Sequence, residues 1–207
     1  MAGPKAEILT VGHSNHPIEQ FVDLLRRNGV TALADVRSAP FSRFNPQFNK
    51  DTLQKSMKDA GIAYIFLGKE LGARSNDRSC YENGRVQYDR LAKTEAFRSG
   101  IARVRKGAQE HRVALMCAEK EPLECHRTLL VAKALEREGE AVVHIHADGH
   151  LERHADAMRR LLDITGMPHE DMFTSEADLI EEASRRQEAK VAYVEEEQAD
   201  YKKESAG

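Results

Sequence analysis

Short apolar runs alternate with amphipathic segments along most of this chain. Five runs are apolar enough to form buried strands, at residues 8–11, 32–36, 62–67, 113–116 and 141–145. Apolar residues at helical spacing predict helices at residues 17–28, 51–60, 88–107, 122–139 and 151–164. This alternation predicts a three-layer α/β fold, in which a mostly parallel, Rossmann-like sheet of about five strands carries helices on both faces.

A long connection without a clear period follows the second predicted strand, at residues 37–49. It interleaves Phe41, Phe44 and Phe48 with polar and charged residues. Such a mixture suits stacking against the bases of a nucleic acid. It equally suits a loop that folds back onto the sheet and buries its Phe side chains, and this second arrangement is the one we expect.

Charge divides the chain into two parts. The whole chain has a net charge of −3, but residues 170–207 hold twelve acidic and five basic side chains, a net of −7. The remaining 26 basic and 22 acidic side chains leave +4 on residues 1–169. We expect a single α/β domain over residues 1–169 and an acidic tail over 170–207 that is helical or partly disordered. The mildly basic body suits an anionic ligand, although +4 is far from the charge of a strongly basic nucleic-acid binder.

Cysteine content and hydropathy indicate a cytoplasmic protein. Three cysteines, Cys80, Cys117 and Cys125, do not resemble the disulfide framework of a small secreted domain. No stretch approaches the roughly 20 apolar residues that a membrane span needs. The first ten residues also lack an apolar run of signal-peptide length. We therefore expect reduced thiols and no membrane partner.

Reactive side chains follow the predicted strands at their carboxyl ends. Parallel strands end at the same edge of a sheet, and ligands of α/β proteins bind outside that edge. We therefore expect one site there. Its candidate residues are His13 and Ser14 after the first strand, Asp35 and Arg37 around the end of the second, and Cys117 and Glu119 after the fourth.

The loop from Cys117 to Arg127 carries the most suggestive chemistry. Cys125, His126 and Arg127 fall in the first turns of the predicted helix that begins at Pro122. A helix start gathers free N–H groups and partial positive charge, which stabilise thiolates and anions. His126 could transfer a proton, and Arg127 could bind a phosphate or carboxylate with two parallel hydrogen bonds.

The same loop also has interpretations without function. A cysteine at a strand end is often an inert, buried hydrophobic residue. Glu119, Glu121 and Glu124 could neutralise Arg127 without binding any ligand. Likewise, Asp35 and Arg37 lie two residues apart on one strand face and could form a structural ion pair rather than hold a substrate.

Three known kinds of site match this loop poorly, two of them because of residue spacing and one because of a missing motif. A protein-tyrosine-phosphatase loop needs Cys and Arg six positions apart, whereas Cys117 and Arg127 are ten apart. Zinc is disfavoured because the adjacent Cys125 and His126 seldom point at one ion and no C-x-x-C pair exists, so we expect no metal and no other cofactor. A Cys117–Cys125 redox pair fits the spacing but lacks a thioredoxin-type motif.

Four histidines near the end of the predicted domain look like a metal-binding run. No carboxylate or cysteine ligand is grouped with them, and we expect them on the surface. They are His144, His146, His150 and His154.

The segments 10–15, 34–49, 64–74 and 117–135 together resemble the domain-of-unknown-function 488 family, over about residues 7–165. The resemblance brings no settled activity with it. It implies a set of functional positions, namely His13, Ser14, Asp35, Arg37, Cys117, Glu119, Cys125, His126 and Arg127.

Our leading hypothesis is an enzyme that acts on an anionic, nucleotide-like or phosphorylated substrate through a Cys117 thiolate. Catalysis would involve Cys117, His13, His126 and Glu119, with His13 or His126 as the acid–base partner. Binding would involve Ser14, Asp35, Arg37, Cys125 and Arg127, with Arg37 and Arg127 holding the anion. Two alternatives remain open: a non-catalytic module that binds nucleic acid or nucleotides, and a scaffold or regulator that binds partners through its acidic tail.

Overall fold

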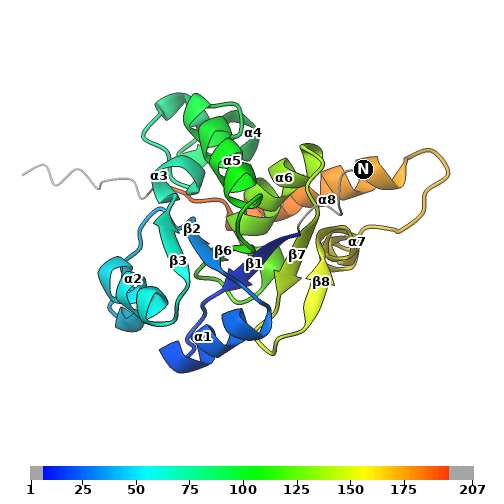
Figure 1. The fold of residues 1–207 in the computed structure, drawn as a ribbon. Helices are drawn as coiled ribbons and strands as arrows, with labels where there is room; N and C mark the ends of the chain where they lie inside the picture. The colour runs from blue at the N-terminus through cyan, green and yellow to red at the C-terminus, as the bar shows by residue number, and fades with distance from the viewer. Residues whose placement is uncertain (1–6, 196–207) are drawn as a thin grey trace, which may run out of the picture.

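A computed structural model describes residues 7–195 of the chain. Its main sheet has six strands in the order β3-β2-β6-β1-β7-β8 (Figure 1). The strands are β1 (Ile8–Gly12), β2 (Ala32–Asp35), β3 (Ala63–Phe66), β6 (Val113–Cys117), β7 (Val142–Ile145) and β8 (Leu151–Arg153). The first five are parallel, and β8 is antiparallel to β7. The predicted α/β fold is therefore confirmed, with six strands rather than about five.

The additional strand β8 occupies residues that the sequence pattern assigns to a helix. Gly149 has a φ of +90°, which residues with a side chain rarely adopt, and it lets the chain reverse directly after β7. Residues 151–153 then pair with β7 at the edge of the sheet. Helix α7 consequently begins only at His154 and runs over His154–Thr165.

Helices cover both faces of the sheet (Figure 1). Helices α1 (Ile18–Arg27) and α2 (Lys50–Asp59) lie on one face, where they pack against strand residues such as Leu9 and Leu33. The other face carries α5, α7 and the segments around them, and contacts the alternate strand residues, such as Leu115. A strand points successive side chains to opposite faces, so two hydrophobic cores form on the two sides of one sheet.

The connection between β3 and β6 is more structured than its sequence suggests. It contains α3 (Gly68–Leu71) and a two-stranded hairpin, β4 (Tyr81–Glu82) and β5 (Arg85–Val86). The hairpin turns at Asn83-Gly84, where both residues have positive φ, as a tight two-residue hairpin requires.

The predicted helix over residues 88–107 is in fact two helices, α4 (Tyr88–Leu91) and α5 (Glu95–Gly107). Thr94 separates them because its side chain accepts a hydrogen bond from the backbone N–H of Phe97. A threonine in this role starts a new helix rather than continuing the previous one.

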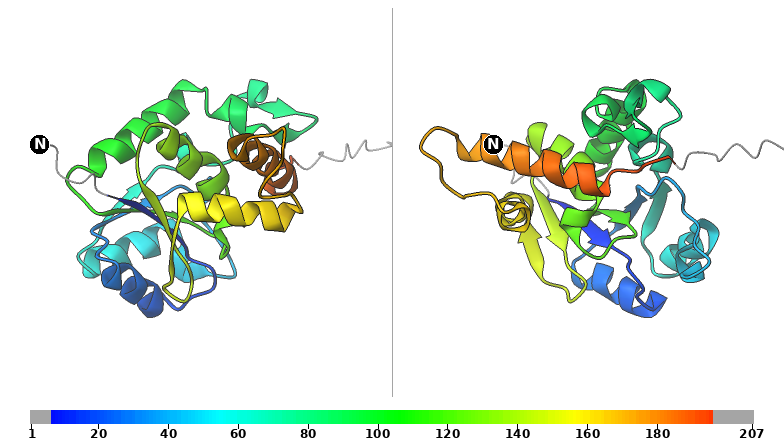
Figure 2. Two further views of the ribbon diagram at one scale, coloured as in Figure 1. Left: turned by 90° about the vertical axis from the view of Figure 1, so that its right-hand side faces the viewer. Right: turned by 180° about the vertical axis from the view of Figure 1, so that it is seen from behind.

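Much of the acidic segment is folded onto the body. Helix α8 (Glu176–Val191) is capped at its N-terminus by the side chain of Ser175, and it packs along α7. Its Leu179 and Ala183 are buried in the same core as α5 and α7. The chain then passes the hairpin, where the backbone N–H of Val86 donates to the carbonyl of Tyr193 (Figure 2). Between residues 7 and 195, no helix is both long and apolar enough to cross a membrane.

The strand order places a topological switch beside β1. The chain leaves β1 toward β2 on one side, and it passes from β6 to β7 on the other. Ligands of doubly wound α/β proteins bind at such a point, outside the carboxyl ends of the strands. In this sheet those ends are Gly12 of β1 and Cys117 of β6, which are register partners.

Candidate functional site

The loop after β6 does not form the regular α-helix that its sequence predicts. Residues Pro122–Glu124 form a single 3₁₀ turn, Cys125 has an extended backbone, and a π-helical turn follows over Arg127–Ala132. Only then does the α-helix α6 (Lys133–Arg137) begin. Short π-helical turns are rare in proteins as a whole, and many of those that occur lie at functional sites. Because the backbone is extended at Cys125, the side chain of Cys125 does not point in the direction that a regular helix would give it.

The side chains of Cys117, Cys125 and His126 converge. Cys117 Sγ lies 3.6 Å from His126 Nδ1, and Cys125 Sγ lies 3.9 Å from the same nitrogen. The two sulfur atoms and a ring nitrogen all lie within 4.8 Å of one another. The adjacent Cys125 and His126 therefore do point toward one place, contrary to the expectation from their positions in the sequence. The reason is that Cys125 is extended while His126 is already helical.

His126 is oriented by the end of β2. Its Nε2 lies 3.0 Å from the carbonyl oxygen of Val36, and this contact requires a proton on Nε2. The lone pair of Nδ1 in the neutral ring therefore faces the two sulfur atoms. Burial opposes a charge on His126, but the hydrogen bond with Cys125 and the charge of that sulfur raise the pKa of the imidazole above its usual value.

The two thiols have opposite electrostatic surroundings. Burial raises the pKa of Cys117 well above its usual value, and the contact with Cys125 raises it further. Burial also acts to raise the pKa of Cys125. The hydrogen bond from Cys117, the positive charge of Arg127 and the contact with His126 outweigh burial and hold the pKa of Cys125 well below its usual range. Of the two sulfur atoms, Cys125 is the one favoured as a thiolate.

Glu119 is the nearest carboxyl group to these thiols. Its Oε2 lies 3.0 Å from Cys125 Sγ, so that the sulfur and the carboxyl share one proton. Glu119 as a whole is exposed, but its carboxyl lies against protein, and this loss of water raises its pKa. The charge at Cys125 raises the pKa of Glu119 further. A thiolate at Cys125 and a protonated Glu119 are thus mutually consistent.

Arg127 supports the loop and does not line a cavity. Its side chain is completely buried, with Nη1 donating to the Glu119 carbonyl at 2.7 Å and Nη2 to the Lys120 carbonyl at 3.3 Å. Its backbone N–H lies 3.4 Å from Cys125 Sγ. The structure thus places Arg127 as a positive charge behind the thiolate rather than as a group that faces a ligand.

Asp35 and Arg37 form a buried ion pair at the end of β2. Arg37 Nη2 lies 2.7 Å from Asp35 Oδ2, and Arg37 Nε donates to Asp35 Oδ1 at 2.9 Å. The hydroxyl of Tyr64 donates to the same carboxylate. Further donation from Arg37 to the Phe48 carbonyl ties the loop of residues 37–49 to the strand end.

His13 is held in one orientation by this group. Its Nε2 lies 3.1 Å from Arg37 Nη1, its Nδ1 lies 2.8 Å from the carbonyl of Ser14, and its ring stacks on Phe48. Because Arg37 can only donate, Nε2 accepts and Nδ1 carries the proton. Burial and the charge of Arg37 lower the pKa of His13 to about 4, so the ring is neutral near pH 7. Both ring nitrogens are thus engaged away from the thiols.

A cavity of about 290 Å³ opens at the carboxyl ends of β2 and β6. Five of the predicted site residues line it, namely Arg37, Cys117, Glu119, Cys125 and His126. The other four, His13, Ser14, Asp35 and Arg127, are not among its lining residues and lie behind or beside it.

The predicted set of site residues leaves out three side chains that also line the cavity, Arg74, Tyr88 and Tyr193. The Arg74 guanidinium lies over the Tyr193 ring at 4.3 Å from its centroid. Arg74 follows the third predicted strand, so its position at the strand ends is visible in the sequence. No local pattern marks Tyr88 or Tyr193, because they reach the cavity only through the packing of α4 and of the residues that follow α8.

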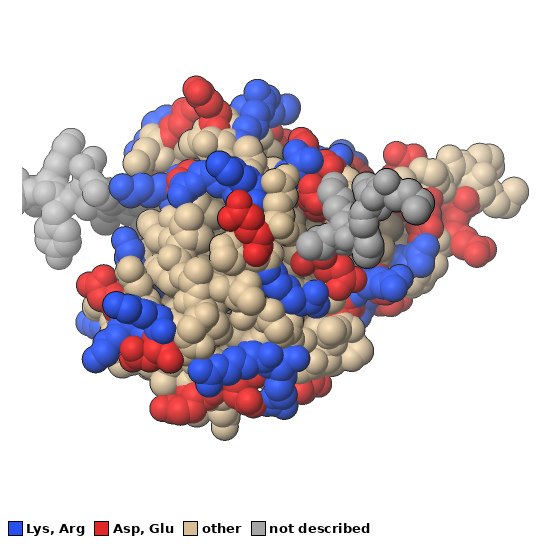
Figure 3. Space-filling model, in the orientation of Figure 1, with Lys and Arg blue, Asp and Glu red and all other residues tan. Residues whose placement is uncertain are grey.

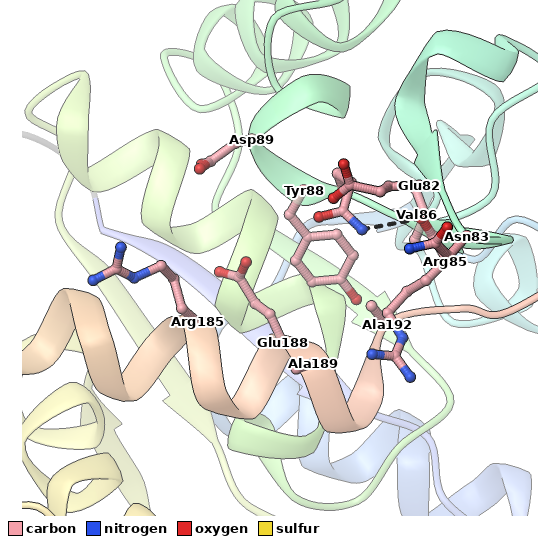
Figure 4. Close-up of a pocket in the computed structure, with 11 residues that line it drawn as sticks. Glu82, Asn83, Arg85, Val86, Tyr88, Asp89, Arg185, Glu188, Ala189 and Ala192 are labelled. Atoms are coloured by element: carbon pink, nitrogen blue, oxygen red, sulfur yellow. Dashed lines mark hydrogen bonds between the residues drawn. The ribbon is translucent and has the colours of Figure 1, made fainter.

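Tyr88 also borders a second cavity, of about 460 Å³, between the hairpin and α8. Figure 4 shows its ring between Glu188 on one side and Glu82 on the other. Burial raises the pKa of the Tyr88 hydroxyl, and the charges at Cys125 and Glu188 raise it further. The Tyr88 phenol is therefore neutral near pH 7. Its ring lines both cavities and lies between them.

Two of the histidines expected on the surface are completely buried. His144 Nδ1 lies 2.7 Å from Thr10 Oγ1, and His144 Nε2 lies 3.0 Å from His154 Nδ1. Both side chains lie between β7 and α7. The surface prediction is wrong for these two because His144 occupies an inward position of an apolar strand, where its polar atoms need an internal partner.

The expectation for the loop of residues 37–49 is only partly right. Phe48 is buried, whereas Phe41 and Phe44 are 69% and 90% exposed. Exposed aromatic rings suit base stacking, but Lys and Arg are interspersed with Asp and Glu on the face that Figure 3 shows. Nucleic-acid binding by this loop stays a prediction.

Comparison with known proteins gives a family and a distant structural neighbour. The domain of unknown function DUF488 matches residues 17–134, more than half of the chain. No curated protein matches. The crystal structure of a "Putative phosphatase (DUF442)" from Shewanella putrefaciens CN-32 is similar with 12% sequence identity and a TM-score of 0.39, and the match covers 92% of this chain and 93% of that one.

Proposed function

We propose that this chain, which belongs to the DUF488 family, is an enzyme that uses the Cys125 thiolate as a nucleophile toward a small anionic substrate. The observation that carries this proposal is the contact of 3.0 Å between Cys125 Sγ and Glu119 Oε2 at the wall of the 290 Å³ cavity. It provides a nucleophile and a proton carrier at one place that a ligand can reach.

The proposal assigns the nucleophile to Cys125 rather than to Cys117. Arg127 supports a negative charge on Cys125 through both its backbone N–H and its guanidinium. Cys117 keeps its proton and donates it toward Cys125. His126 contacts the thiolate through its Nδ1, which lies 3.9 Å from Cys125 Sγ. His13 is a positioning residue, because its Nε2 accepts a hydrogen bond from Arg37.

The expected reaction has two steps at one electrophilic centre. Cys125 Sγ forms a bond to that centre, the bond to the leaving group breaks, and the leaving group takes the proton that Glu119 holds. A water molecule then gives a proton to the Glu119 carboxylate and attacks the same centre. The bond to sulfur breaks, and the thiolate is restored.

The cavity supports a small substrate with negative charge. A volume of about 290 Å³ lies just below the usual range for ligand pockets, which begins at about 300 Å³, so the substrate must be small. Arg37 and Arg74 line it and supply positive charge, while Glu124 and Glu119 limit how much negative charge it accepts. We place this chemistry in the cytoplasm, where thiols stay reduced.

Alkylation of the reduced chain by iodoacetamide, after treatment with a chelator, tests the nucleophile. We expect modification of Cys125 at a rate that falls less steeply with falling pH than that of an ordinary thiol, because its pKa is held well below the usual range. Cys125→Ser should abolish this reaction, whereas Cys117→Ser should retain it. Peptide mass spectrometry identifies the modified residue.

Cys80 provides a matched control because it is equally buried but lies outside the cavity. Cys80→Ser should leave the rate and pH profile of alkylation unchanged. Modification of Cys117 in preference to Cys125, or a rate that rises tenfold per pH unit as for an ordinary thiol, would contradict the assignment.

A further inference from the structure

We propose that the reduced site binds one Zn²⁺ ion through Cys117 Sγ, Cys125 Sγ and His126 Nδ1, with its fourth position open to the cavity. This inference goes beyond the proposed function, because it rests on the geometry of three ligand atoms and not on the reactivity of either thiol. It also revises the sequence argument, in which adjacent Cys125 and His126 do not share an ion.

The two sulfur–nitrogen separations match a tetrahedral site. With Zn–S bonds of about 2.3 Å and Zn–N bonds of about 2.0–2.1 Å, sulfur and nitrogen ligands lie about 3.6 Å apart. The observed separations from His126 Nδ1 are 3.6 Å to Cys117 Sγ and 3.9 Å to Cys125 Sγ. Both sulfur–nitrogen separations are therefore close to those that the ion requires, and all three ligand atoms lie within 4.8 Å of one another.

The imidazole is oriented as a ligand. A metal-binding histidine usually donates its other ring N–H to a carbonyl or carboxylate, which fixes the ring and its tautomer. His126 Nε2 lies 3.0 Å from the Val36 carbonyl, so Nδ1 presents its lone pair to the point between the two sulfur atoms. A histidine that served only to fill the core would not need this lone pair to face two thiols.

The surroundings also suit thiolate ligands. The backbone N–H of Arg127 lies 3.4 Å from Cys125 Sγ, as expected for a hydrogen bond that stabilises a metal-bound thiolate. Two thiolates balance the charge of a divalent ion, so the loaded site adds no net charge to a buried place. A set of two sulfurs and one imidazole favours zinc over hard cations such as Mg²⁺, which take oxygen ligands.

The fourth position distinguishes a reactive site from a purely structural one. Glu119 contacts Cys125 but is not part of the compact group of ligand atoms. The three protein ligands and the adjoining cavity leave room for a water molecule, with Glu119 within reach as its proton acceptor. Three protein ligands plus water is the arrangement of catalytic zinc sites, whereas structural sites have four protein ligands.

Binding of zinc and alkylation of Cys125 are mutually exclusive, because both use the same sulfur. The chelator-treated protein and the loaded protein are therefore two states of one site. Failure of the alkylation test would leave the zinc proposal standing, and failure of metal binding would leave the nucleophile assignment standing.

Titration of the reduced, chelator-treated full chain with Co²⁺ and Zn²⁺ tests the site. Co²⁺ should bind with a stoichiometry of one and give both the thiolate-to-cobalt charge-transfer bands and the intense visible bands of tetrahedral coordination. Zn²⁺ should displace it and protect Cys125 from iodoacetamide. Absence of the charge-transfer bands in the wild-type chain would overturn the proposal, whatever the behaviour of the variants.

Variants assign the ligands. Cys117→Ser, Cys125→Ser and His126→Gln should each weaken Zn²⁺ binding by about 100-fold or more, measured by competition with a metal-sensitive dye. Cys80→Ser should bind as the wild type does, and Glu119→Gln should keep the stoichiometry and the charge-transfer bands. Circular dichroism of each variant verifies folding. Equal affinity in the wild type and both cavity-cysteine variants would show that the ion lies elsewhere.

Discussion

Gly12 illustrates how a missing side chain shapes this site. A Cβ atom at this position would lie 1.9 Å from the carbonyl oxygen of Glu119 and 3.3 Å from Arg127 Nη1. The loop after β6 can therefore approach the end of β1 only because residue 12 has no side chain. That approach brings the Glu119 carbonyl to within 2.7 Å of the buried guanidinium.

We predict that Gly12→Ala destabilises the chain by about 3 kcal/mol or more, because the shifted carbonyl strains the packing and leaves the buried Arg127 without its closest partner. Urea-induced unfolding measures the change. Gly107→Ala is the matched control, since the nearest atom to its Cβ is Val113 Cγ2 at 3.8 Å. The control should change stability by less than about 1 kcal/mol. Similar losses in both variants would show that the contact at Gly12 is unimportant.

The types of residue at the site could be predicted from the sequence, but their roles could not. His13, Arg37 and Cys117 all lie at or just after the carboxyl ends of buried strands, and the parallel direction of those strands brings them to one edge. Whether an arginine faces a cavity or supports a loop depends on carbonyl groups that only the folded chain positions. The two thiols likewise differ in pKa because of Arg127 and His126, whose placement depends on a π-helical turn.

Helix α8 is the element whose contribution the sequence least reveals. Its charged residues suggest a solvated tail, yet Leu179 and Ala183 are buried, and Gln187 Nε2 donates to the Leu123 carbonyl. Lys133 forms ion pairs with two glutamates of the helix. A narrow apolar stripe is enough for docking here because its partner surface on α6 and α7 is already formed.

We predict that a chain ending at residue 174 loses about 3 kcal/mol or more of unfolding free energy, because removal of α8 exposes the apolar surface under Leu179. Thermal and urea unfolding, followed by circular dichroism, measure the loss. A chain ending at residue 195 is the control, since it keeps every contact of α8 described above. If the chain ending at residue 174 were as stable as this control, the segment after residue 169 would be an independent appendage.

The strands differ in how well local sequence specifies them. Four of the five parallel strands, β1, β2, β6 and β7, stand out as apolar runs because both of their faces are covered. The edge strand β3 is also apolar, although Ala63 and Ile65 are exposed. The hairpin at Asn83-Gly84 has a strong local signal in that dipeptide. Strand β8 has none, because an exposed edge strand of three residues resembles the first turn of the helix that follows it.

At the scale of the whole molecule, the stability of the fold depends on pH through the buried pair His144 and His154. Burial, followed by the charge of Lys133, lowers the pKa of His154 from 6.5 to about 4. Burial and the charge of His154 also lower the pKa of His144. The unfolded chain therefore binds more protons than the folded one between about pH 4 and 6.5, so stability falls as the pH falls through this range.

We predict that His154 alone accounts for a loss of about 2 kcal/mol of unfolding free energy between pH 7 and pH 5. Urea unfolding of the wild type and of His154→Gln at both pH values measures this contribution. It is the difference between the two proteins in the slope of unfolding free energy against pH. His111→Gln, at an exposed position, should keep the wild-type slope. An unchanged slope in His154→Gln would contradict the assignment of a neutral buried imidazole.

The overall architecture could be predicted because alternation of apolar runs with amphipathic segments admits few arrangements. Strand order could not be predicted in the same way. The insertion of β6 between β2 and β1 creates the switch point, and it depends on contacts between segments about a hundred residues apart. The site follows from that insertion, since it places Cys117 beside Gly12.

The wall of the cavity that Val191 and Tyr193 provide has a consequence for biosynthesis. All six strands and both cavity cysteines precede residue 154, so a ribosome releases them before α8 and the residues after it. A nascent chain can thus assemble its sheet and its pair of sulfur atoms while one side of the cavity is still open. A metal ion or a first ligand can therefore enter from this additional side during translation, before Tyr193 reaches Arg74 and adds its wall to the cavity.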